Sequence, residues 1–122
     1  MTLIGTTNAP IPFVFQVILR MVAQPHRAIE AVKTLRSLTI AAQVERGFIA
    51  SRIYQLADNP EVLCLQEDWA SEAELKSHIR SSSFTELLIF METAPEAPVF
   101  EIRFVSKVSG LEYIEAVRFG DN

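Results

Sequence analysis

The chain has 122 residues, of which 49% are hydrophobic and 21% charged, a composition typical of one folded domain and not of a disordered chain. Eleven Lys and Arg against 15 Asp and Glu give a net charge of -4, and no basic cluster favours a nucleic-acid partner. The longest apolar run, Ile11–Phe15, is too short to span a membrane, and no basic region precedes it. We therefore expect neither a membrane segment nor a signal peptide.

The sequence holds a single cysteine, Cys64, and two histidines. One cysteine excludes an intrachain disulfide and fits a reducing, cytoplasmic location. Because Cys64 lies between leucines, we expect an inert, buried thiol. So few His and Cys side chains predict no metal site and suit a protein without a cofactor. The mean hydropathy of +0.21 indicates surplus apolar surface, either around a pocket or against a partner.

Residues 1–12 predict an irregular arm, residues 13–108 one domain, and residues 109–122 a C-terminal tail. In chain order the first predicted elements are a strand over Phe13–Ala23 and a helix over His26–Glu45 that Gly47 ends. A hairpin follows, with strands over Phe48–Leu56 and Val62–Trp69 and a turn at Asp58-Asn59-Pro60. Capping boxes at Ser71 and Ser83 open two short helices, Val99–Val108 predicts a strand, and Leu111–Phe119 has helical spacing. The buried stripe expected on the long helix is Ile29, Val32, Leu35, Leu38 and Ala42.

The order strand, helix, strand, strand, helix, strand predicts an α+β, ferredoxin-like β-α-β-β-α-β fold with a four-stranded antiparallel sheet. Helices would cover one face of that sheet. On the last strand Phe100, Ile102 and Phe104 alternate with polar residues. Together with the high apolarity, this favours a homodimer in which a second copy covers the face that the helices leave open.

Two residues are candidates for catalysis. Trp69 shares a strand face with Glu67 and two leucines. Its indole could line a pocket and donate a hydrogen bond to an oxygen atom there, or it could be an ordinary core side chain whose N–H has a partner. His78, in the short helix after Ser71, could act as a base or orient a phenol, although a structural bond to the next loop explains it as well.

Arg52 and Tyr54 share a strand face with Phe48. An arginine in an apolar row needs a carboxylate or a path to solvent, and Glu67 on the neighbouring strand is the predicted partner. Such a pair suits either a pocket or a dimer salt bridge. Gln16 and Arg20 on the first strand leave the same two alternatives open. The sequence holds no nucleotide-binding, nucleophile-elbow or zinc-protease motif.

From about Phe13 to Phe104 the chain resembles the antibiotic biosynthesis monooxygenase family of dimeric α+β barrels. The residues that carry the resemblance are Gln24-Pro25-His26, Glu45-Arg46-Gly47-Phe48, Asp58-Asn59-Pro60, Glu67-Asp68-Trp69 with Ala70-Ser71-Glu72, and His78-Ile79-Arg80-Ser81-Ser82-Ser83-Phe84. The sequence departs from the family's usual pattern in having His26 for glycine, Ser83 for a second histidine, and Leu75 for the tyrosine of members that oxidise anthrones.

The resemblance implies a cofactor-independent monooxygenase that oxidises a quinol-like or polycyclic phenol with dioxygen in an apolar pocket. Trp69 and His78 would be catalytic, and Arg52, Tyr54, Glu67 and Phe84 would bind the small aromatic substrate. The competing interpretation is a non-catalytic dimeric barrel that binds a small apolar ligand. Haem degradation fits less well, since Leu19 stands at the family's strand asparagine and no histidine follows His78.

Overall fold

A computed structural model describes residues 14–120, so the predicted arm over residues 1–12 and the first residue of the predicted first strand lie outside it. The elements are β1 (Val14–Val22), α1 (Ala28–Ile40), a 3-10 turn (Ala41–Val44), β2 (Phe48–Leu56), β3 (Asn59–Trp69), α2 (Glu72–Ile79), α3 (Ser82–Met91), β4 (Val99–Val105) and α4 (Leu111–Arg118). Among these residues no helix combines the length and apolarity that crossing a bilayer requires.

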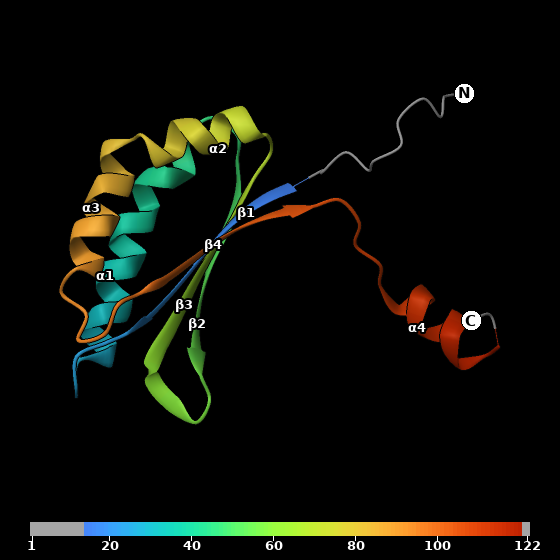
Figure 1. Ribbon diagram of the computed structural model, residues 1–122, viewed down its shortest axis with the longest axis horizontal. Coiled ribbons are helices and arrows are strands. Elements are labelled where there is room, and N and C mark those ends of the chain that lie inside the picture. The colour runs from blue at the N-terminus through green and yellow to red at the C-terminus, as the bar shows by residue number, and fades with distance from the viewer. Residues whose placement is uncertain (1–13, 121–122) are drawn as a thin grey trace.

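The four strands form one antiparallel sheet in the order β2-β3-β1-β4. Helices α1, α2 and α3 lie together on one face of it, and within residues 14–120 no helix packs on the opposite face (Figure 1). We call these the helix face and the open face. The arrangement confirms the predicted α+β, ferredoxin-like sheet with helices on one side.

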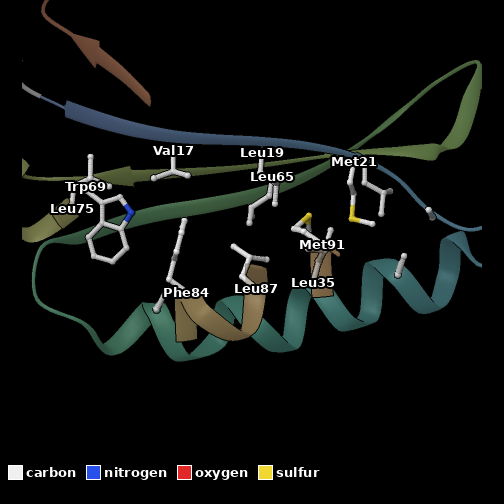
Figure 2. Close-up of a cluster of buried hydrophobic side chains, with 14 residues drawn as sticks. Val17, Leu19, Met21, Leu35, Leu65, Trp69, Leu75, Phe84, Leu87 and Met91 are labelled. Atoms are coloured by element: carbon white, nitrogen blue, oxygen red, sulfur yellow. The ribbon is translucent and has the colours of Figure 1, made fainter. Parts of the chain in front are cut away.

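The core lies between the helix face and the helices (Figure 2). Val17, Leu19 and Met21 alternate along β1 and are all buried, as the two-residue period of a strand requires. They lie opposite Glu67, Leu65 and Leu63 of β3 in the antiparallel register. The helices contribute buried side chains from the other side of this layer, including Leu35, Leu75, Phe84, Leu87 and Met91.

The long helix differs from its prediction at its end and in its buried side. It is α-helical only to Ile40, and a 3-10 turn continues to Val44. Gly47 has a positive φ, of +86°, but it lies in a turn in which the amide of Phe48 donates to the carbonyl of Glu45. The glycine therefore leads into β2 and does not end the helix, contrary to the prediction. The buried residues of α1 are Ala31, Leu35 and Thr39, while Ile29, predicted to be buried, is 71% exposed.

Both caps and the hairpin were predicted from short motifs, with mixed success. The side chain of Ser71 accepts from the amide of Glu74 and so caps α2 as expected, but the cap of α3 is Ser81 and not Ser83. In the hairpin β3 begins at Asn59, which already pairs with Leu56. The turn is therefore tighter than the predicted Asp58-Asn59-Pro60 loop.

The second strand contains an irregularity that separates residues predicted to share a face. A register shift lies between Phe48 and Ala50, and a bulge of this kind changes which side of the sheet the following residues occupy. Phe48 packs edge-on against Trp69 on the helix face, whereas Arg52 lies opposite Gln66 and Tyr54 opposite Cys64 on the open face. The prediction that Phe48 accompanies Arg52 and Tyr54 is wrong for this reason.

The apolar row of β4 lies on the helix face and not on the open face. Phe100 pairs with Leu19, Ile102 with Val17, and Phe104 with Phe15, and the rings of Phe15 and Phe104 meet edge to face with centroids 5.4 Å apart. The row therefore cannot help a partner to cover the open face, as the sequence had suggested. It stays between 41% and 56% exposed.

Helix α4 stands apart from the rest of the domain. It lies on the far side of the strands from α1, α2 and α3 (Figure 1). None of its residues is buried. The helical spacing expected for Leu111–Phe119 is thus present, with Phe119 as the residue that follows the helix.

Candidate functional site

The two candidate catalytic residues lie in contact at one end of the core. Trp69 comes from the end of β3 and His78 from the last turn of α2. Glu67, two residues before Trp69, shares its face, and Phe84 of α3 completes the group. Trp69 is 0%, Glu67 1% and His78 2% exposed, so the cluster lies inside the protein.

The imidazole of His78 lies between two carboxylates. Its Nδ1 is 3.0 Å from Oε1 of Glu45, in hydrogen-bond geometry. Its Nε2 is 3.0 Å from Oε1 of Glu67, but this contact lacks the direction of a hydrogen bond. Burial lowers the pKa of His78, and the two carboxylates, Glu67 more than Glu45, raise it by more, so the pKa lies above its ordinary 6.5.

Glu45 is the member of this cluster that sequence reasoning missed. It follows the 3-10 turn and stands two residues before Gly47, and Ser83 donates a hydrogen bond of 2.9 Å to its Oε2. Ser81 donates to the carbonyl of His78 at 2.6 Å. In the sequence, Glu45 is a carboxylate two residues before a glycine at the end of a predicted helix, a pattern too common to single out a site residue.

The indole of Trp69 lies against the imidazole. The two ring centroids are 4.4 Å apart at an interplanar angle of 24°, and Phe84 meets His78 edge-on at 5.3 Å. Figure 2 shows Trp69 and Phe84 in the layer between sheet and helices. Indole Nε1 is buried and has no hydrogen-bond partner within the part of the chain that the structure describes, which is unusual because a buried N–H without a partner costs about 1–3 kcal/mol.

Arg52 and Tyr54 lie on the opposite face of the sheet from this cluster. Nη1 of Arg52 is 3.1 Å from Oδ2 of Asp68, and Gln16 donates to Oδ1 of the same carboxylate at 3.0 Å. The predicted pair of Arg52 with Glu67 is therefore wrong, because adjacent residues of β3 point to opposite faces. The sheet separates the six predicted site residues into a buried cluster of four and an open-face pair.

The open face has two hollows, and Arg20 and Cys64 line both of them. One, about 340 Å³, extends toward Glu101 and Arg103, and the other, about 210 Å³, extends toward Tyr54. Cys64 is half-buried here. Its predicted burial is only partly correct, since its thiol points away from the core formed by its leucine neighbours.

The histidine, cysteine and acidic side chains of residues 14–120 do not form a set of metal ligands. No group of three or more His, Cys, Asp or Glu side chains there could hold an ion. Inside the core, each ring nitrogen of His78 lies 3.0 Å from a carboxylate oxygen, and the other histidine, His26, lies on the surface.

The comparisons with known proteins agree with this fold. A protein from Methanosarcina mazei Go1 is 28% identical, with a TM-score of 0.68 over 76% of this chain and 93% of that one. A protein from Pseudomonas aeruginosa is 17% identical, with a TM-score of 0.66 over 83% and 100%. A structure named antibiotic biosynthesis monooxygenase is 16% identical, with a TM-score of 0.64 over 79% and 99%.

The curated proteins give no significant match. The sequence model of the family described as antibiotic biosynthesis monooxygenase matches residues 14–88, which is more than half of the chain and includes β1 to most of α3. The chain belongs to the antibiotic biosynthesis monooxygenase family.

Proposed function

We propose that this protein is a cofactor-independent monooxygenase that oxidises a quinol-like or polycyclic phenol with dioxygen. The observation that carries the proposal is the buried cluster in which His78 lies between Glu67 and Glu45, beside an indole N–H that has no partner. A proton-holding group and a free donor in dry surroundings are what this chemistry needs.

The side chains have separate roles in the proposal. The substrate lies against Trp69 and Phe84, and its acidic proton passes to Glu67 while the imidazolium of His78 balances the resulting anion. Indole Nε1 donates to the oxygen on which negative charge develops. Because the side chains of Trp69 and His78 are buried, helix α2 has to move away from β3 to admit the substrate.

The reaction needs no outside reductant. For a substrate with an activated methylene group, the carbanion forms a bond to one oxygen atom of O₂. That carbon ends as a carbonyl, having lost two hydrogens, and the second oxygen atom leaves as water. The substrate supplies all the electrons, so one O₂ is consumed for each carbonyl formed.

Oxygen uptake by the chelator-treated protein tests the proposal, with hydroquinones and anthrones as substrates. We expect Trp69→Phe to lower the rate about a hundredfold, the usual effect of losing one donor to a developing oxyanion. Tyr113→Phe, an exposed aromatic of α4, is the matched control and should keep the full rate. Equal rates for the wild type and Trp69→Phe would contradict the proposal.

A non-catalytic binder is the second candidate, and a separate hollow favours it. This hollow, about 130 Å³, lies between β1, α1 and α3 and is lined by Met21, Ala31 and Phe90 among others. It is accessible in the structure, unlike Trp69. Thermal stabilisation by small apolar compounds without any oxygen uptake, lost in Ala31→Trp, would favour this function over the oxygenase.

We also propose that the protein works as a homodimer through the open face. The polar network of Arg52, Asp68 and Gln16 and the hollows beside Tyr54 and Cys64 lie on that face. In this proposal Arg52 and Tyr54 act at the interface, and the buried cluster holds the substrate.

A further inference from the structure

Helix α4 has one apolar side, and that side lies uncovered. At about 100° per residue Leu111, Ile114 and Val117 lie along one stripe of the helix, with Tyr113 at its border. Arg118 ends this stripe at the last residue of the helix, and Glu112 lies on the opposite side. The stripe consists of Leu111, Tyr113, Ile114 and Val117, which are between 48% and 64% exposed. A helix this short is not stable alone in water, so it requires a surface on which to pack.

A second uncovered apolar surface is the row of Phe100, Ile102 and Phe104 on β4. It lies on the helix face at the edge of the sheet, where α1, α2 and α3 leave it partly exposed. The row is roughly 13 Å long at the rise of a strand, and the eight residues of α4 are about 12 Å long at the rise of a helix. The two surfaces match in length and chemistry.

We infer that α4 packs on the β4 row of a second copy of this chain, and that the second copy returns its own α4 in exchange. In the structure α4 projects to the side of the sheet away from the helix face (Figure 1), so it does not cover the row of its own chain. It projects instead toward the side from which a copy facing the open face would approach.

The connection is long enough for this exchange. The six Cα-to-Cα steps from Val105 to Leu111 reach roughly 20 Å when extended. A partner sheet packed face to face lies about 10 Å away, so about half of that reach is left to pass its edge to the helix face. The linker can therefore pass around the edge of a partner sheet. The inference uses the proposed dimer but is independent of the proposed activity.

The exchange also buries enough surface to matter. A fully covered aromatic side chain buries roughly 150–250 Å², and each chain offers Phe100, Phe104 and Tyr113 at about half exposure. When the aliphatic neighbours are included and both reciprocal contacts of the dimer are counted, the total surface buried is on the order of 1,000 Å². Specific protein–protein interfaces begin at about this size.

Cysteine cross-linking tests the exchange, because a disulfide forms only where two Cβ atoms come within about 4.5 Å. Two differently tagged full-length chains, each carrying Cys64→Ser, are co-expressed, one with Ile114→Cys on the stripe and the other with Ile102→Cys on the row. We expect mild oxidation to shift both tags together to the mass of a dimer. The matched control replaces Ile102→Cys by Ile89→Cys, an exposed position on α3 (59% against 46%), and should give no covalently linked dimer.

Placing both cysteines in one chain identifies the alternative. If Ile102→Cys and Ile114→Cys in the same chain link within that chain and the product keeps the mass of a monomer, α4 folds back on its own row and the inference is wrong. A cross-linking yield for Ile102→Cys no higher than that of the Ile89→Cys control also overturns it. Circular dichroism of each variant confirms that the chains are folded.

Discussion

The indole of Trp69 lies face to face with the imidazole of His78, at a centroid separation of 4.4 Å. The contact joins the end of β3 to the last turn of α2. An aromatic face favours a neighbouring cation, so the stacking acts in the same direction as the two carboxylates that raise the pKa of His78.

Removing the imidazole should destabilise the fold strongly. His78→Ala leaves Glu67, which is 1% exposed, without its partner, and breaking a buried ion pair in this way costs about 3–5 kcal/mol. Urea unfolding measures the loss. Lys76→Ala on the same helix removes only an exposed pair with Glu72 and should cost less than about 0.5 kcal/mol. A loss as small in His78→Ala would show that the buried pair is unimportant to stability.

Stability should fall as the solution becomes more alkaline. The pKa of His78 is raised in the folded protein, so the folded state holds the proton more tightly than the unfolded one. The stabilisation is complete below the unfolded-state pKa of about 6.5 and is lost as the pH rises through the folded-state value. Urea midpoints from pH 5.5 to 9 should show this decline in the wild type.

His78→Gln is the control for that pH dependence, since it keeps a polar side chain but cannot be protonated. The decline across the pKa of His78 should be absent in this variant. A wild-type curve that stays flat or rises over the same interval would contradict the raised pKa.

Reversing the charge of Arg52 should weaken the proposed homodimer. Arg52→Glu places a second carboxylate beside Asp68, which the wild-type Arg52 contacts at 3.1 Å, and like charges in an interface are strongly unfavourable. Sedimentation should show the dissociation constant raised at least about tenfold. Lys33→Glu makes the same change of charge on the exposed side of α1 and should leave the dimer intact.

Replacing His26 by glycine should stabilise the chain slightly. His26 has a φ of +63°, a conformation that costs a residue with a side chain roughly 1–2 kcal/mol. The greater freedom of glycine in the unfolded state offsets about 0.4–1 kcal/mol of this. We therefore expect His26→Gly to raise the free energy of unfolding by about 0.5 kcal/mol, the difference between those two terms.

Gly47→Ala provides the opposite test of the same backbone argument. Gly47 also has a positive φ, of +86°, and a Cβ there would collide with the side chain of Glu74. This variant should be destabilised by more than about 1 kcal/mol. Thermal or urea unfolding of both variants, beside the wild type, decides whether the two changes have opposite signs.

Local patterns in the sequence were sufficient to predict most of the fold. Three features depend on neighbours within a few positions: the alternation of apolar residues in β1 and β3, the cap at Ser71, and the positive φ of Gly47. Errors arose where one residue changes the phase, as at the register shift after Phe48. A shift of this kind leaves no composition signal but moves Arg52 and Tyr54 to the other face.

The α+β class and the apolar surplus were therefore determined by the sequence alone. Only the tertiary structure decided where that surplus lies, because the pairing of β4 with β1 puts Phe100, Ile102 and Phe104 on the helix face. It also decided the partners of the charged residues. Glu67 contacts His78 and Asp68 contacts Arg52, since adjacent residues of a strand point to opposite faces and their partners come from distant parts of the chain.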